Sequence, residues 1–343
     1  LHSTSRRQRQ MCIRDRVKGI ADSFYNMYEA HRYLLKSTRL EAEDLKEYKS
    51  LRELFRAGDT GRIEIAIQRL CRLVYLHYQI LPVILGDEYD TPLLEAYTDG
   101  YWSEMIGTCR QLFHSTFKEN PYYARALITG VTKVSKNSLF SDLNNLETDT
   151  VTCDAYSDCF GFTEQEVMDA LKCQNMDTMH DVKEMYDGFI FGQRRDIYNP
   201  WSITNYLKEK KLKPYWAATS SNALISKLIQ TASADMKKQM ERLLNGELIT
   251  VSFDEQVVFS QLEQDESAIW SLLVASGYLK VEDVEYRGMT LEPWYHLDIT
   301  NLEAVSMFSN MFKGWFAPVA SNYNEFILSL IHISEPTRLR CIS

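Results

Sequence analysis

The sequence lacks the motifs of several large enzyme classes. No glycine loop ending in Gly-Lys-Ser or Gly-Lys-Thr, the usual cradle for nucleotide phosphates, occurs among its 343 residues. Gly-x-Ser-x-Gly and Gly-x-Gly-x-x-Gly are also missing, which argues against a serine hydrolase and a dinucleotide-binding enzyme. The seven His form no His-Glu-x-x-His motif and the seven Cys form no Cys-x-x-Cys pair. We therefore expect no zinc site. We also expect the cysteines to be free thiols, as in a cytoplasmic protein.

Long apolar runs are missing as well. No stretch approaches the ~18 apolar residues of a membrane-spanning helix, and the first residues are too basic and polar for a secretory signal. We expect neither membrane insertion nor export. With 45% hydrophobic and 25% charged residues, the composition is that of a globular protein with a sizeable core.

The two ends differ from the rest of the chain. Residues 1–16 carry five Arg and one Asp without apolar periodicity, and residues 328–343 close the chain equally abruptly. Both segments resemble translated sequencing-adapter read-through, so we interpret them as non-native; disordered tails are the alternative. Without them the chain is more acidic than its net charge of −9. This acidity argues against broad binding to phosphate backbones but is compatible with a local basic patch.

An apolar run that ends abruptly in acids is the most informative feature present. Val83-Ile84-Leu85 predicts a fully buried strand, which places Asp87 and Glu88 at its carboxyl end, where open parallel sheets bind ligands. In nucleotide hydrolysis, the first carboxylate can hold Mg²⁺ and the second can polarise the attacking water. Asp90 either supports the metal shell or closes the turn. A solvated acidic turn after a core strand is the competing interpretation.

A second strand is predicted at residues 124–129. Helical periodicity fills residues 17–79, and another amphipathic helix separates the two strands. Strand, helix, strand is a βαβ unit, so the strands should lie parallel and Thr129 should share the sheet edge of Asp87. There Thr129 can bond the attacking water or a phosphate, or only cap the strand. Lys133 can face phosphate charge, or be an ordinary surface lysine.

The second half of the chain changes character. Thr163 with Glu166 forms a capping-box pattern, and Asn199 is placed as a helix cap before Pro200. A helix that stops at Gly277 precedes two predicted strands joined by a turn at Arg287 and Gly288. Helices followed by such a wing are the outline of a winged-helix domain.

Seven ordered motifs resemble those of the prokaryotic AAA-ATPase-like family, from about Val17 to about Trp315. They are Val83-Ile84-Leu85-Gly86-Asp87-Glu88-Tyr89-Asp90, Leu127-Ile128-Thr129-Gly130, residues 138–146, Phe160-Gly161-Phe162-Thr163, Tyr186-Asp187-Gly188-Phe189, Tyr198-Asn199-Pro200-Trp201-Ser202 and residues 216–222. The resemblance implies a relative of P-loop NTPases, often fused to a restriction-endonuclease-like domain.

By position, the resemblance also implies roles for individual residues. Asp87 looks like the magnesium-side acid of a Walker B motif, Glu88 like the catalytic base and Thr129 like the sensor at the end of the next strand. Lys133 stands where the family commonly has Arg, which keeps the charge but loses the planar fork.

We therefore expect an α/β fold in three parts. Residues 17–155 should form an incomplete P-loop NTPase-like parallel sheet with helices on both faces, residues 156–245 a helical and hairpin lid, and residues 246–318 a winged-helix-like domain. Family members begin with a central strand and a phosphate loop upstream. Without them, the sheet should expose apolar residues, and the fragment should be poorly stable or aggregate.

The expected function follows from the same resemblance. The complete parent protein should bind and hydrolyse ATP with Mg²⁺. This fragment should bind neither ATP nor Mg²⁺ tightly, and it should be inactive. The alternative is a non-catalytic module that binds protein or nucleic acid through the winged-helix region. A regulatory ATPase half of a nuclease in phage or mobile-element defence is a third possibility that rests only on analogy.

Overall fold

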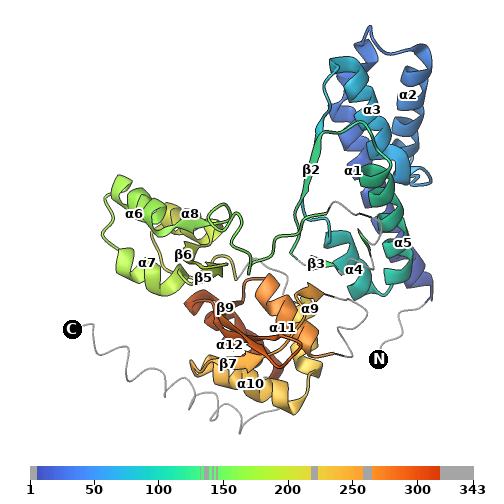
Figure 1. The fold of residues 1–343 in the computed structure, drawn as a ribbon. Coiled ribbons are helices and arrows are strands. Elements are labelled where there is room, and N and C mark those ends of the chain that lie inside the picture. Colours follow the sequence, from blue (N-terminus) through green and yellow to red (C-terminus); the bar gives the residue numbers. More distant parts are fainter. Residues whose placement is uncertain are drawn as a thin grey trace. The chain divides into compact units, whose positions relative to one another are not determined.

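A computed structural model of the chain describes residues 6–131, 133–134, 139–140, 143, 146–217, 223–257 and 265–316 (Figure 1). The chain divides into two compact units, residues 1–147 and residues 148–343. Each unit mixes helices with small sheets, which confirms the expected α/β class. Within the described ranges, no helix combines the length and apolarity needed to cross a bilayer.

Three helices that lie side by side begin the first unit (Figure 1). They are α1 (Arg6–Ala30), α2 (Ala42–Arg56) and α3 (Ala66–Tyr78), with short 3₁₀ helices η1 (Arg32–Lys36) and η2 (Ile63–Ile65) between them. Tyr28, Tyr48 and Phe55 are fully buried among Leu side chains, and the rings of Tyr28 and Tyr48 are 5.2 Å apart. This aromatic core explains the long helical periodicity of the sequence.

A parallel two-stranded sheet follows the three helices. Strand β1 (Val83–Gly86) pairs with β2 (Arg125–Ile128), with Val83 opposite Arg125 and Gly86 opposite Ile128. The connection contains α4 (Thr91–Asp99), α5 (Trp102–Phe113) and a π-helical turn, η3 (His114–Lys118). The predicted βαβ unit is therefore confirmed, with two helices in the crossover instead of one.

The prediction that β1 and β2 are fully buried is wrong. Leu85 is 75% exposed, Val83 58% and Leu127 59%. The physical reason is the size of the sheet: in the described part of the unit, β1 and β2 pair only with each other, and two strands alone cannot enclose their side chains. The same exposures confirm the expectation that this sheet presents apolar residues to solvent. A larger P-loop-type sheet with helices on both faces stays a prediction.

The second unit begins with an antiparallel sheet and three helices. The elements are β4 (Phe162–Thr163), α6 (Glu164–Cys173), α7 (Met179–Tyr186), β5 (Phe189–Phe191), β6 (Arg194–Tyr198) and α8 (Pro200–Glu209), with sheet order β4-β6-β5. Thr163 and Glu166 form the predicted capping box, and the Asn199 side chain accepts hydrogen bonds from the amides of Trp201 and Ser202. Both predicted helix starts are thus confirmed.

A second small sheet occupies the rest of this unit. The elements are α9 (Ala223–Thr231), α10 (Ala234–Leu244), β7 (Ile249–Val251), β8 (Gln256–Val257), α11 (Ser267–Ala275), β9 (Leu279–Arg287), β10 (Glu292–Ile299) and α12 (Leu302–Phe316). The predicted wing strands form the antiparallel hairpin β9–β10, and β7 pairs with β10, so the order is β7-β10-β9.

Buried polar contacts join the two parts of the second unit. The Glu303 carboxylate on α12 is fully buried and accepts hydrogen bonds from the Ser202 hydroxyl at 2.8 Å and the Trp216 amide at 2.6 Å. Burial raises the pKa of Glu303. Asn301 donates through its Nδ2 to the carbonyl of Tyr186 at 3.2 Å. These contacts tie α12 to both α7 and α8.

Candidate functional site

The carboxyl ends of β1 and β2 meet at one edge of the sheet. Beyond the last ladder pair, the Thr129 amide donates to the Gly86 carbonyl at 2.8 Å, and the Tyr89 amide donates to the Thr129 carbonyl at 3.0 Å. The two chain segments therefore stay paired past the strands themselves. This pairing brings Asp87 and Thr129 together, as the βαβ unit predicts.

Asp87 and Thr129 are in direct contact. The Thr129 hydroxyl donates to Oδ1 of Asp87, and the same oxygen accepts the Glu88 amide at 3.0 Å. Two donors on one carboxylate oxygen fix the orientation of the group, because each restricts its rotation. Asp87 is exposed to solvent, so the carboxylate is both oriented and accessible.

Glu88 has an unusual backbone conformation beside Asp87. Its φ of 51° lies in the left-handed region, which costs a non-glycine residue about 1 to 2 kcal/mol. The Thr91 amide donates to the Glu88 carbonyl at 3.1 Å, and the Thr91 hydroxyl lies 3.4 Å from Glu88 Oε2. The turn before α4 thus holds an exposed carboxylate in a strained position, which is common at functional sites.

Asp90 lies behind these two residues and is only 1% exposed. Its Oδ1 accepts the Val131 amide at 3.3 Å, and its carbonyl accepts the amides of Leu93 and Leu94 at the start of α4. A Cβ added to Gly130 would lie 2.6 Å from Asp90 Oδ1, so only glycine lets the two loops approach this closely. The turn-closing role of Asp90 is visible in these contacts.

Aromatic rings pack around Tyr89, and Lys133 follows Thr129 in the chain. The backbone of Lys133 lies in the short strand β3 (Lys133–Val134), and its side chain is outside the described residues. The Tyr89 ring packs 5.5 Å from the Phe140 ring, and Phe113 stacks on Phe140 at 5.6 Å. The sequence analysis assigned no role to Tyr89 or Gly130. Their positions in the sequence could have suggested one, because Tyr89 lies between Glu88 and Asp90 and Gly130 directly follows Thr129.

The carboxylates can take part in a magnesium site only together with other ligands. Among the residues whose positions are described, no group of three or more His, Cys, Asp or Glu is arranged to hold a metal ion. Mg²⁺ is usually bound by one or two carboxylates together with water and substrate phosphates. The oriented, accessible Asp87 fits that pattern, in which the nucleotide supplies the remaining oxygens.

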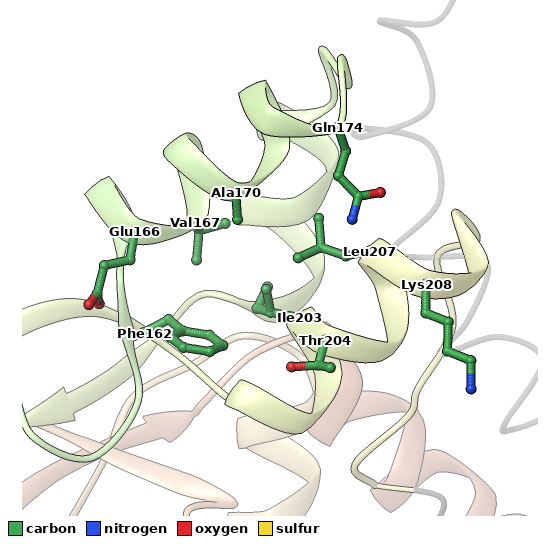
Figure 2. A pocket seen from close by; sticks show the side chains of 9 residues that line it. All are labelled: Phe162, Glu166, Val167, Ala170, Gln174, Ile203, Thr204, Leu207 and Lys208. Atoms are coloured by element: carbon green, nitrogen blue, oxygen red, sulfur yellow. The ribbon is translucent and has the colours of Figure 1, made fainter.

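The second unit contains a separate cavity of about 480 Å³ between α6 and α8 (Figure 2). Its floor is apolar, with Phe162, Val167 and Ile203, whereas Glu166 and Lys208 lie at opposite ends. Glu166 already accepts the Thr163 amide and hydroxyl, which lowers the pKa of its carboxyl. The apolar floor of the cavity can hold an apolar group.

Comparisons with known proteins give one family match, which lies in the first unit, and one longer match to a relative. Residues 13–140 match a family model described as Predicted AAA-ATPase. An uncharacterized protein in the vnfD 5' region of Azotobacter chroococcum mcd 1 is 28% identical over 225 residues, which cover 64% of this chain. The chain spans about 40% of that relative's length. No solved structure matches the chain.

The matched family segment contains the acidic strand end, Thr129 and Lys133. This agrees with the motifs that carry the resemblance in the first half of the sequence. Residues 13–140 of this chain are therefore similar to the AAA-ATPase-like family.

Proposed function

We propose that the protein containing this chain binds and hydrolyses ATP with Mg²⁺. The observation that carries the proposal is the hydrogen bond from Thr129 to Asp87 across two parallel strand ends, beside the strained and exposed Glu88. The bond orients one carboxylate for a metal, and the turn holds a second one for a proton.

Each residue then has a distinct role. Asp87 contributes a carboxylate to the magnesium shell and Glu88 accepts a proton from the attacking water. Thr129 senses the state of the site, because its hydroxyl can donate either to Asp87 or to a phosphate oxygen. Lys133 supplies positive charge toward the phosphates, and Asp90 supports the metal side by holding the two loops together. A bound Mg²⁺ would neutralise charge that develops on the phosphates.

The same proposal limits what this chain does alone. A Gly-Lys-Ser or Gly-Lys-Thr phosphate loop does not occur in its sequence, so we expect no turnover of ATP by these 343 residues. We expect the phosphate loop, and any fused nuclease domain, in the remainder of a longer protein.

The test is ATP hydrolysis by the protein that the complete reading frame encodes. Glu88→Gln should lower phosphate release at least about a hundred-fold while nucleotide binding persists, because the amide cannot accept the proton. Thr129→Val should also lower the rate, and Thr129→Ser should retain most of it. Glu104→Gln, an exposed acid on α5, is the matched control. Undiminished hydrolysis by Glu88→Gln would rule out Glu88 as the base.

A second candidate function is binding of a partner through the winged-helix-like region. The order β7-β10-β9 and the exposed Tyr286, Met289 and Leu291 near the β9–β10 turn favour it. The residues Ile269–Val274 of α11 are all buried, so this helix is a poor candidate for entering a DNA groove. Partner binding that is lost in Arg287→Ala and independent of nucleotide would support this function over ATP hydrolysis.

A further inference from the structure

An aromatic surface lies where η1 meets the end of α3. The ring of Tyr33 is 5.5 Å from that of His77, 5.9 Å from that of Tyr78 and 5.8 Å from that of His31. Tyr33 is 38% and Tyr78 51% exposed, so the cluster reaches solvent. We call these four residues the aromatic cluster.

Three cationic residues lie in or next to the segments that build the aromatic cluster. Arg39 donates through Nη1 to the His77 carbonyl at 2.9 Å, which places its guanidinium beside the cluster. In a 3₁₀ helix, side chains at i and i+3 lie on the same face, so Lys36 shares the face of Tyr33. Arg32 is exposed in the same turn, with 69% of its side chain accessible.

Acids are scarce in the two segments that build this surface. Residues 30–40 and residues 73–86 contain no Asp or Glu, although the whole chain has a net charge of −9. The nearby Glu29, 4.0 Å from Arg32, also pairs with Arg52. Arg39 also satisfies the His77 carbonyl in the last turn of α3 by donating a hydrogen bond to it. A carbonyl without a donor at this helix end would repel an anion. The two segments are therefore locally basic within an acidic chain.

We propose that this surface binds single-stranded nucleic acid. Exposed aromatic rings provide stacking platforms for unpaired bases, and cations at their edge pair with the phosphates between those bases. A duplex offers the phosphates but keeps its bases stacked internally, so it cannot use Tyr33 and Tyr78. The site is independent of ATP hydrolysis and of the winged-helix-like region.

The test measures fluorescence anisotropy of labelled oligo-dT and oligo-U, about 12 nucleotides long, with the purified chain. We expect binding in the micromolar range at about 50 mM salt, and a log–log salt slope near −2, since three cations each release about 0.7 counterion from a single strand. Tyr33→Ala and Tyr78→Ala should each weaken binding about ten-fold, because a stacked base is lost. Arg39→Gln should weaken binding and make the salt slope shallower by about 0.7.

Matched variants separate stacking from charge and from misfolding. Tyr33→Phe and Tyr78→Phe keep the ring and should retain binding. Tyr156→Ala, which removes a tyrosine that is 65% exposed in the second unit, and Lys237→Gln should change nothing. Circular dichroism is the control that tests whether each variant is folded. Equal affinity for a duplex, unchanged binding in Tyr33→Ala and Tyr78→Ala, or no binding up to about 100 μM protein would overturn the proposal.

Discussion

Gly188 is required by a close contact as well as by its backbone conformation. Its φ is +123°, and a Cβ added there would lie 1.9 Å from the carbonyl oxygen of Thr300. Gly246 also has a positive φ of +79°, but a Cβ there would meet nothing within 4 Å. Comparing substitutions at the two glycines therefore distinguishes the effect of steric overlap from that of backbone strain.

Gly188→Ala should destabilise the protein much more than Gly246→Ala. We expect about 1 kcal/mol for Gly246→Ala from strain alone, and more than about 3 kcal/mol for Gly188→Ala, because the Thr300 backbone must also move. Urea unfolding followed by circular dichroism measures both. Equal losses would show that the contact with Thr300 relaxes freely.

Asp187 is destabilised in its charged form. Burial raises the pKa of Asp187 to about 6, and the neighbouring Asp196 adds to this shift, while the Gly188 amide and Lys183 oppose it. Lys183 also contacts Glu164 at 2.6 Å and Asp196 at 3.1 Å, and it holds the pKa of Asp196 below its usual value. The buried Tyr198, whose own pKa is raised, borders the same acids.

Asp187→Asn should remove a pH dependence of stability. Between the unfolded pKa of 3.8 and the folded value of about 6, the folded chain binds more protons than the unfolded chain, so this group lowers the free energy of unfolding as pH rises. The amide mimics the protonated acid. We expect a gain of about 1 kcal/mol at pH 7 and almost none below pH 4, after allowing for partial exposure.

Thermal melts from pH 4 to pH 8 test this expectation. Asp181→Asn changes an exposed acid on the same helix, α7, and is the control. An Asp187→Asn gain that is the same at every pH would contradict the assignment, because it would not depend on ionisation.

Part of the candidate site was predictable from the residues that end the strands. Parallel pairing of β1 and β2 follows from the βαβ pattern, and it dictates that Asp87 and Thr129 meet. The left-handed Glu88 and the tight approach of Gly130 to Asp90 were not predictable, because each depends on how two loops pack in space. The side chain of Lys133 falls outside the described residues.

The three-helix core of the first unit depends on tightly packed residues of α2. Leu51 is fully buried beside the Tyr28, Tyr48 and Phe55 rings. Leu51→Ala should lower the free energy of unfolding by about 2 to 5 kcal/mol, because it removes apolar contacts and leaves a cavity. Lys49→Ala, at an exposed position of the same helix, should change it by less than about 0.5 kcal/mol. Chemical denaturation compares them, and similar losses would show that α2 is not part of the core.

Helix starts were predictable where a local pattern decides them, as with Thr163 and Asn199. The exposure of β1 and β2 was not predictable. An apolar run such as Val83-Ile84-Leu85 indicates a strand that is more stable when buried, but it does not indicate whether another element covers it. The hairpin β9–β10 was predictable from its turn, whereas its pairing with β7 depends on contacts distant in sequence.

The uncovered sheet of the first unit should make the chain self-associate. Leu85 and Leu127 are 75% and 59% exposed on neighbouring strands with open edges. Replacing both by Thr introduces β-branched strand formers and removes apolar surface, so it should reduce the associated fraction several-fold. Light scattering against protein concentration measures it. Leu248→Thr, at a position 51% exposed in the second unit, is the control, and an equal effect there would contradict the role of the sheet.

The buried Glu303 has a consequence for how this protein can be dissected. Its bonds to Ser202 and Trp216, with that of Asn301 to Tyr186, link the β4-β6-β5 and β7-β10-β9 regions, so we expect these regions to unfold together. A truncation near residue 245 would separate the Glu303 carboxyl from its donors at Ser202 and Trp216, and we expect it to destabilise both pieces. We therefore expect residues 148–316 to tolerate exchange between related proteins better as a whole than in parts.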